Sequence, residues 1–504
     1  MTPPLRLAEF MAALSLATDL GMGQPMEQGL RTCLVALELA DAVRAEASVL
    51  PEVYYTALLR FLGCTADAHE AAAIGGDDIA LRAAIAPVLG EAPGPFLRAV
   101  LPALGPGLSA PRRAALGASF LATGPGRMRQ GVRAHCEAAE MLAERLGLPA
   151  GIRAALATAF EQWNGHGFPN SVTGESIPLA ARVVAVARDV EVMARLGGRD
   201  AVSGVLRGRA GHSYDPVLAD AALVNLDRLL EAAGTEMPWD VALRREPQPH
   251  ANVLPERLDD ILAVFADFAD LKEPRRAGFS RDVAGLAAGA APEHAPFVRR
   301  VGLVQDLGRV AVPNRAGGRG GSPADDERLR LHPYYSERVL GRLPTTAPLA
   351  RVAGLHHERL DGSGYYRGAT GADLPWEARV LAAADVLREL TLEIPGRAAP
   401  TPAQAATALA RLAPRQLDGD AVDAVLVAAG MRARRGRPAW PAGLTEREVE
   451  VLRLICRGAS KKAVAAALGI SPSTADHHIR HIYGKIGVSS RAAATLFAVE
   501  RDLL

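Results

Sequence analysis

The chain contains HHERLDGSGYYRGATGADLPWEARVLAAAD at residues 356–385, and residues 159–188 repeat its pattern as AFEQWNGHGFPNSVTGESIPLAARVVAVAR. The matching positions share one offset of 197 residues, as between Glu161 and Glu358. The other matches at this offset are Gly165 with Gly362, Gly167 with Gly364, Pro178 with Pro375, Arg182 with Arg379 and His135 with His332. So many coincidences at one register predict two copies of one helical domain.

Composition places this domain pair in a globular all-α protein. The chain has 504 residues, of which 49% are hydrophobic and 22% charged, so several domains are expected. Apolar residues recur at helical spacing, and no apolar run reaches the ~18 residues that span a bilayer. The N-terminus does not resemble a signal peptide. Four scattered cysteines without a Cys-x-x-Cys pair favour a reduced, cytoplasmic protein that does not act at a membrane (Cys33, Cys64, Cys136 and Cys456).

Two stretches rich in proline, glycine or basic residues are interpreted as linkers. The first is 234–255, and the second is 432–443, with the sequence RARRGRPAWPAG. They divide the chain into an N-terminal domain (1–233), a middle domain (256–431) and a small C-terminal domain (444–504). The expected architecture is therefore two tandem helical domains followed by a four-helix domain.

Charge is distributed unevenly along the chain, whose formal net charge is +1. From Arg432 onward there are 13 lysines and arginines against 6 acidic residues, whereas the preceding part has 44 against 50. A basic tail on a mildly acidic body is typical of a protein that binds the phosphate backbone of nucleic acid. Charge alone is equally consistent with a solvated basic face.

The C-terminal domain carries start and stop signals for four short helices. Thr445 and Glu448 form a capping box, and Ser460 begins a second helix that Gly469 ends. Ser471-Pro472 begins a third helix to about Ile486, and a fourth begins near Ser490-Arg491. In the third helix, Ala475, Ile479, Ile482 and Ile486 face inward, which leaves a polar and basic outer face. Two helices joined by a glycine turn, the second of them basic, fit a recognition helix in a major groove.

This segment closely resembles the LuxR-type helix-turn-helix over roughly 60 residues, from Leu444-Thr445-Glu446-Arg447-Glu448 to Ser489-Ser490-Arg491. Ala475 departs from the valine usual in that family. The resemblance implies binding to double-stranded DNA as a homodimer, with the last helix at the dimer contact. It implies DNA contacts at Lys461, Lys462, Ser473, Thr474, His477, His478, Arg480, His481, Lys485 and Arg491. A helical bundle with basic solvent-facing positions is the alternative.

The middle domain contains histidines and aspartates in otherwise apolar helical segments. They are Asp306, His332, His356, His357 and Asp385. A lone histidine in such a segment is more often a core or surface residue. Five such residues in four segments favour a metal site, because imidazole and carboxylate suit iron, manganese or zinc and a buried charge needs a partner.

These segments resemble the HD-GYP branch of the HD phosphohydrolases over about residues 263–394, most specifically at 356–365. Members of that branch hydrolyse phosphodiesters such as cyclic di-GMP at a two-metal centre. Tyr366 stands where the family has proline. Two further departures affect metal ligands, because the family's histidine-aspartate pair is Gln305-Asp306 here and an earlier histidine is Phe279.

The resemblance implies that one metal set is damaged and the other intact. The damaged set retains only Asp306 and Asp385, whereas the other keeps Asp306 and three histidines (His332, His356 and His357). We therefore expect at most one metal ion, because phenylalanine and glutamine do not replace imidazole donors. Arg309 replaces a lysine and could still hold a phosphate. In the N-terminal copy only His135 survives, against Arg60-Phe61, Ala159-Phe160 and Arg188.

Three hypotheses follow. The favoured one is a transcription regulator whose degenerate body senses a nucleotide or other small ligand or mediates oligomerisation. The second is a metal-dependent phosphohydrolase with a DNA-binding tail. The sequence counts against it, because a competent two-metal enzyme should not lack ligands at Gln305 and Phe279. In the third hypothesis, the two tandem helical domains serve only to dimerise the C-terminal domain. No residue is assigned a catalytic role.

Overall fold

The computed structural model describes residues 5–314, 323–392, 400–431, 440–501 and 503. They form two compact units, Met1–Met431 and Arg432–Leu504, which are described separately below. The fold is helical, with one two-stranded ribbon, and this confirms the expected all-α class. None of the described helices combines the length and apolar character needed to cross a membrane.

The N-terminal half of the first unit begins with β1 (Leu5–Arg6). Its helices are α1 (Leu7–Gly21), α2 (Gln28–Ala42), α3 (Leu50–Leu59), α4 (Ala68–Gly75), α5 (Asp78–Ile85), α6 (Pro93–Val100), α7 (Ala110–Arg145), α8 (Ala150–Ala157), α9 (Leu179–Arg209), α10 (Pro216–Val224) and α11 (Leu226–Ala233). Gly197 and Gly198 interrupt α9, because their backbone angles are not helical.

The rest of the first unit holds the candidate metal ligands. Its elements are α12 (Pro238–Arg244), β2 (Asn252–Val253), α13 (Leu258–Asp270), α14 (Phe279–Ala290), α15 (Ala295–Val304), α16 (Pro323–Arg330), α17 (His332–Leu340), α18 (Ala347–Ala353), α19 (Trp376–Leu390), α20 (Pro402–Leu412) and α21 (Gly419–Ala428). Two short 3-10 turns matter for the site, η5 (Pro274–Arg276) and η7 (Leu307–Ala311).

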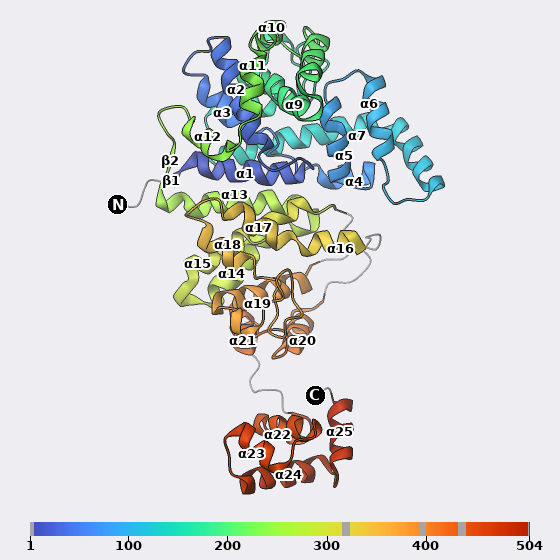
Figure 1. The fold of residues 1–504 in the computed structure, drawn as a ribbon, viewed down its shortest axis with the longest axis vertical. Coiled ribbons are helices and arrows are strands. Elements are labelled where there is room, and N and C mark those ends of the chain that lie inside the picture. The colour runs from blue at the N-terminus through green and yellow to red at the C-terminus, as the bar shows by residue number, and fades with distance from the viewer. Residues whose placement is uncertain (1–4, 315–322, 393–399, 432–439, 502, 504) are drawn as a thin grey trace. The chain divides into compact units, whose positions relative to one another are not determined.

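One continuous hydrophobic core joins the two halves of this unit. In Figure 1, α1 and α13 lie between the N-terminal helices and the remainder of the unit, and Phe10 and Phe265 meet edge to face with ring centroids 6.5 Å apart. A buried ion pair crosses the same boundary, with Lys272 Nζ 2.6 Å from Asp78 Oδ2. The halves are therefore packed into one body.

The internal repeat is visible in matching hydrogen bonds. Glu161 accepts from the backbone N–H groups of Asn170 and Val172, and Glu358 accepts from the equivalent groups 197 residues later. Gly167 and Gly364 each lie against the backbone of these glutamates, where a Cβ atom would be 2.4 Å from the glutamate Cα. The same loop is thus built twice, which explains why both sequence stretches keep the glutamate and the glycine.

The stretch 234–255 is not a free linker, and that prediction is wrong. Residues 238–244 form α12, which buries Trp239 and Ala242, and Tyr54 donates a hydrogen bond to the Ala242 carbonyl at 3.1 Å. β2 then pairs antiparallel with β1. Proline begins α12 rather than interrupting it, and the short helix is too brief for its apolar side to show as a periodic pattern. The other domain limits stay predictions.

The second unit consists of α22 (Glu446–Cys456), α23 (Lys461–Leu468), α24 (Pro472–Ile486) and α25 (Arg491–Glu500) around a core of its own. The predicted capping box at Thr445 is confirmed, and Ser460, Ser471 and Ser490 cap the other helices. Gly469 ends α23 and Gly487 ends α24, both at positive φ. The second predicted linker falls mostly on 432–439, outside the described residues.

Candidate metal centre and DNA-binding face

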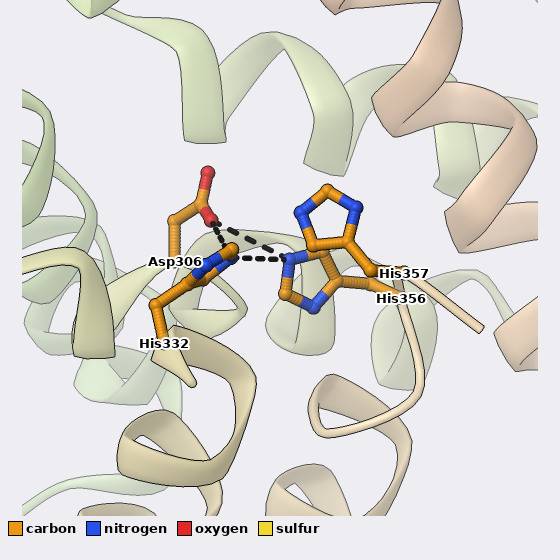
Figure 2. Close-up of side chains that lie close together, drawn as sticks. All are labelled: Asp306, His332, His356 and His357. Carbon is orange, nitrogen blue, oxygen red and sulfur yellow. Dashed lines mark hydrogen bonds and ion pairs between the residues drawn. The ribbon is translucent and has the colours of Figure 1, made fainter. Parts of the chain in front are cut away.

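Four predicted metal ligands come together in the first unit. Asp306, His332, His356 and His357 each offer one ligand atom, and these atoms lie within 4.8 Å of one another. Figure 2 shows the imidazoles of His332 and His356 directed at the Asp306 carboxylate. His332 Nε2 is 3.2 Å and His356 Nε2 is 3.5 Å from Asp306 Oδ1, and the two nitrogens are 3.1 Å apart.

Local packing of η7 against α17 brings these residues together. A Cβ atom at Gly308 would lie 2.1 Å from the carbonyl oxygen of His332, so only glycine permits this approach. Ser336 fixes the contact, because its hydroxyl donates to the Gln305 carbonyl at 2.6 Å and accepts from the Gly308 N–H at 2.8 Å. Asp306 precedes η7 and His332 begins α17, so both side chains start from the same contact.

Backbone carbonyls fix the tautomers of two of the histidines. The Nδ1 atoms of His332 and His356 are each 2.6 Å from a carbonyl oxygen, of Leu329 and Ala353 respectively. Since a carbonyl only accepts, each Nδ1 carries the proton and each Nε2 presents a lone pair. Carbonyl contacts of this kind orient metal-ligating histidines in proteins.

The electrostatics keep these groups in the states that bind metal. Burial lowers the pKa of His332 to about 4 and holds the pKa of His357 well below its usual range. Burial alone would raise the pKa of Asp306, but the Arg276 guanidinium holds it well below the usual range. The Nε2 atoms of His332 and His356 and one oxygen of Asp306 thus converge on one point. Asp306 Oδ1 accepts no hydrogen bond from the described residues. Such a donor set fits a transition metal ion.

Asp385, the fifth predicted ligand, lies beside this group rather than in it. Its Oδ2 is 3.8 Å from His357 Nδ1, and its Oδ1 accepts a hydrogen bond of 3.0 Å from the Gln305 amide. Burial raises the pKa of Asp385 to about 6. Gln305 and Phe279, which replace two histidines of the resembled family, are both fully buried here. The donors present therefore do not fit a second metal ion.

Sequence reasoning missed Arg276, which contacts Asp306 and Phe279, two residues at positions that hold the second metal ion in the resembled family. Its Nη2 is 2.5 Å from Asp306 Oδ2 and its Nη1 is 2.6 Å from Glu389 Oε2. Its guanidinium carbon lies 3.5 Å from the centroid of the Phe279 ring. Arginine is not a metal ligand, so a search for histidines and aspartates passes over it. The sequence cue for Arg276 is its position three residues before Phe279, which replaces a metal-binding histidine of the resembled family.

Two further side chains border the centre. The Tyr365 ring stacks on His357 with centroids 4.7 Å apart, and Arg330 lies 5.3 Å from the same ring. Arg309, expected to hold a phosphate, is half-buried and lies 3.5 Å from Glu273. A cavity of about 30 Å³ opens beside it, bordered by Lys272 and Arg276 among others. Three cationic side chains and Glu273 therefore border one small cavity.

In the N-terminal copy, apolar and cationic side chains fill the equivalent place. His135 is buried and meets the Phe160 ring edge to face at 4.9 Å, and the Arg60 guanidinium lies 5.2 Å from that ring. A Cβ atom at Gly63 would lie 1.9 Å from the His135 carbonyl, so Gly63 matches Gly308. Arg60-Phe61 thus stands where Gln305-Asp306 stands, as the sequence predicted.

The predicted DNA-contacting residues lie on three helix faces of the second unit. Lys461 and Lys462 begin α23, Arg491 begins α25, and the remainder lie along α24. All ten are exposed or half-exposed: Lys461, Lys462, Ser473, Thr474, His477, His478, Arg480, His481, Lys485 and Arg491. The Arg480 side chain is 74% exposed, so it is available to a partner.

Several of these residues are engaged within the unit. Lys485 Nζ is 2.7 Å from Glu448 Oε2 and 2.9 Å from the Gly443 carbonyl, and His481 Nδ1 is 2.6 Å from Glu448 Oε1. Lys461 forms an ion pair with Asp476, which also lies 3.0 Å from Arg480. Arg491 donates to the carbonyls that follow α22. These contacts tie α24 to α22 and α23.

Family models match both units. The model described as HD domain matches residues 126–218 and 263–421, together half of the chain. The model described as bacterial regulatory proteins, luxR family, matches residues 442–498. The first matches part of each copy of the repeat, and the second spans α22, α23, α24 and most of α25.

Individual relatives and a solved structure are also similar to this chain. The 3'3'-cGAMP-specific phosphodiesterase 3 of Vibrio cholerae is 28% identical over 405 residues, which are 78% of this chain and 88% of that protein. A crystal structure of a cyclic GMP-AMP-specific phosphodiesterase of V. cholerae superposes with a TM-score of 0.56 at 22% identity, covering 85% of this chain and 98% of that one. The probable transcriptional regulatory protein NarL of Mycobacterium tuberculosis is 45% identical over 76 residues, which are 15% of this chain and 35% of NarL.

Proposed function

The chain belongs to the HD domain family and carries a luxR-family regulatory domain at its C-terminus, and from this premise we propose a transcription regulator. In this proposal the second unit binds double-stranded DNA, and the first unit senses a phosphate-containing ligand at a centre with a single metal ion. The phosphohydrolase-like body serves recognition rather than turnover.

One observation carries this proposal. Asp306 Oδ1 and two imidazole Nε2 atoms converge within 3.5 Å, and both imidazole protons are on the opposite nitrogens. Three lone pairs at this separation repel one another unless a cation lies among them. Asp306, His332, His356 and His357 would hold that ion, which supplies a Lewis-acidic partner for a phosphate oxygen.

We propose ligand recognition rather than hydrolysis because of the residues at the second metal position. Phosphoester cleavage at two-metal sites uses both ions, one for the attacking and one for the leaving oxygen. Here Phe279 has no lone pair, and the Gln305 amide is bonded to Asp385. The body therefore keeps a phosphate-binding cation without the pair that drives hydrolysis. A cyclic dinucleotide is the ligand class to try first, because the similar Vibrio proteins are named for it.

The DNA-binding part of the proposal rests on α24. Its exposed side carries Ser473, Thr474, His477 and Arg480, and Lys462 begins the helix before it. Helix-turn-helix proteins place such a helix in the major groove and bind as dimers to half-sites about one helical turn apart. We propose that two copies read an inverted repeat, with α25 at the dimer contact.

A second candidate function is metal-dependent hydrolysis of a cyclic dinucleotide, and the intact group of four ligands favours it. The two candidates separate in one experiment on the full chain. We would load the protein with Mn²⁺, Fe²⁺ or Zn²⁺, count the bound metal by elemental analysis, and follow cyclic GMP-AMP by chromatography. The proposal expects at most one ion per chain and negligible cleavage. Two ions with metal-dependent turnover would establish the second candidate instead.

A further inference from the structure

The side chains at the damaged metal position contact other side chains of this protein. In the resembled family, the residues matching Phe279, Gln305, Asp306 and Asp385 hold the second metal. Each of these four side chains has a non-metal partner in this protein. The Arg276 guanidinium contacts Asp306 and the Phe279 ring, and the Gln305 amide donates to Asp385.

We infer that the Arg276 guanidinium takes the place of the second metal ion, as a permanent cation that this chain supplies for the buried Asp306 carboxylate. The metal centre proposed above is the premise for where that position lies. Whether Arg276 occupies the second metal position does not depend on whether a metal ion fills the first.

The contacts of Arg276 support this replacement of a metal ion by a guanidinium. The guanidinium is 4% exposed and reaches Asp306 Oδ2 at 2.5 Å, on the carboxylate edge opposite the two histidines. Its other end reaches Glu389 at 2.6 Å. Asp306 therefore bridges two cationic positions, one at Oδ1 among the imidazoles and one at Oδ2, and the second is already filled.

The two substitutions complement each other chemically. Phenylalanine cannot donate to a metal, but its ring face attracts a cation, and arginine stacks on such a face more readily than lysine. Gly278, at φ +75°, turns the chain between η5 and α14, so that Arg276 folds back over the ring of Phe279. A planar guanidinium also meets two carboxylates at once, as it does here with Asp306 and Glu389.

Charge explains why a cation is required at this place. Asp306 and Asp385 are fully buried, and Glu389 is nearby. Among the described residues, Arg276 donates to Asp306 and Glu389, and the neutral Gln305 amide donates to Asp385. A buried carboxylate that loses its partner is strongly destabilising. The guanidinium therefore keeps the pocket folded whether or not a metal ion is bound at the first position.

The test restores the missing histidines with and without the guanidinium. The double variant Phe279→His/Gln305→His retains Arg276, and the triple variant adds Arg276→Gln. A matched triple variant adds Arg388→Gln instead, since Arg388 lies 5.6 Å from the same ring but pairs with the exposed Asp282. Full-length proteins are stripped with a chelator, loaded with Mn²⁺, desalted and measured by elemental analysis.

We expect the Arg276→Gln triple variant to hold one more Mn²⁺ per chain than the double variant, and the Arg388→Gln triple to match the double. An extra ion already in the double variant would overturn the inference, as would equal counts in the double and the folded Arg276→Gln triple. The wild-type count separately tests the proposed single-metal centre.

A second measurement covers variants that fold poorly. The single variant Arg276→Gln leaves Asp306 without its cation until metal is added. We expect Mn²⁺ to raise its Tm by at least about 3 °C more than that of wild type, or to be required for folding. Arg388→Gln should behave as wild type. An Mn²⁺-induced rise in Tm equal to that of wild type would contradict the inference.

Discussion

Asp306 has two carboxylate oxygens with different surroundings. Oδ1 faces the Nε2 atoms of His332 and His356, whereas Oδ2 is bonded to the Arg276 guanidinium. Metal binding at Oδ1 therefore depends on the imidazoles, and the charge at Oδ2 is balanced independently. In the proposed centre, this division would let one metal position persist although the other lacks the histidines of the resembled family.

Replacing one imidazole tests the first position. We expect His332→Ala to lower the affinity for Mn²⁺ by at least about tenfold, because one of the converging donors is removed. Affinity is measured by calorimetric titration of the metal-free chain. The control is His294→Ala, since His294 is half exposed and its partner Glu377 lies outside the centre. Unchanged Mn²⁺ affinity in His332→Ala would show that the four ligands do not act together.

Glu448 makes the second unit sensitive to acid. Burial opposes ionisation of this side chain, but Lys485 and the Thr445 N–H lower its pKa to about 2, against a usual value of 4.5. A pKa lowered on folding contributes stability above 4.5 that is lost as the pH falls toward 2. We expect the Tm of residues 440–504 to fall over this range, and Glu448→Gln to reduce that dependence.

The matched control for this experiment is Glu450→Gln on the same helix. Glu450 pairs with Arg447 at the surface, and both side chains are more than 40% exposed. Exposed pairs contribute little to stability. An equal pH dependence of Tm in wild type and Glu448→Gln would contradict the role given to Glu448.

At the scale of elements, the same glycine contact positions the site in both copies. Gly63 lets the chain after α3 lie against His135, and Gly308 lets η7 lie against His332. We expect Gly308→Ala to destabilise the chain by about 1–3 kcal/mol, because the new methyl group meets a backbone oxygen. Gly285→Ala on α14 is the control, since open space surrounds it, and it should stabilise by about 0.5–1 kcal/mol. Equal thermal stability of the two variants would refute this account.

Two lysines of the second unit are expected to differ in role. Lys462 is exposed at the start of α23, whereas the Lys485 ammonium is bonded to Glu448 and the Gly443 carbonyl. We expect Lys462→Ala to reduce the salt dependence of DNA binding by about one unit of slope with little change in Tm. Lys485→Ala should lower Tm instead. Fluorescence anisotropy and thermal unfolding of both variants check this, and the reverse pattern would refute it.

How far sequence predicted these elements depends on how local their signals are. Thr445, Ser460 and Ser471 cap helices through neighbouring backbone groups, so their helices were placed correctly. The four-ligand cluster followed from a family resemblance and was brought together as expected. Arg276 and α12 were missed, because their roles come from contacts distant in sequence, with Asp306 and Glu389 for the first and with Tyr54 for the second.

At the scale of the whole molecule, the chain combines two units with separate hydrophobic cores. The body is mildly acidic and its described residues include a group of four that could hold a metal ion, while the second unit is basic and presents a polar helix face. The proposed regulator connects ligand recognition in the first with DNA binding in the second.

The most direct test of the proposed regulator is an anisotropy titration of the full chain against a duplex selected from a random library. It is carried out at two salt concentrations, with and without cyclic GMP-AMP and Mn²⁺. We expect binding that weakens steeply with salt, and a DNA affinity that the ligand changes in wild type but not in His332→Ala. No binding to any duplex at either salt concentration would contradict the account.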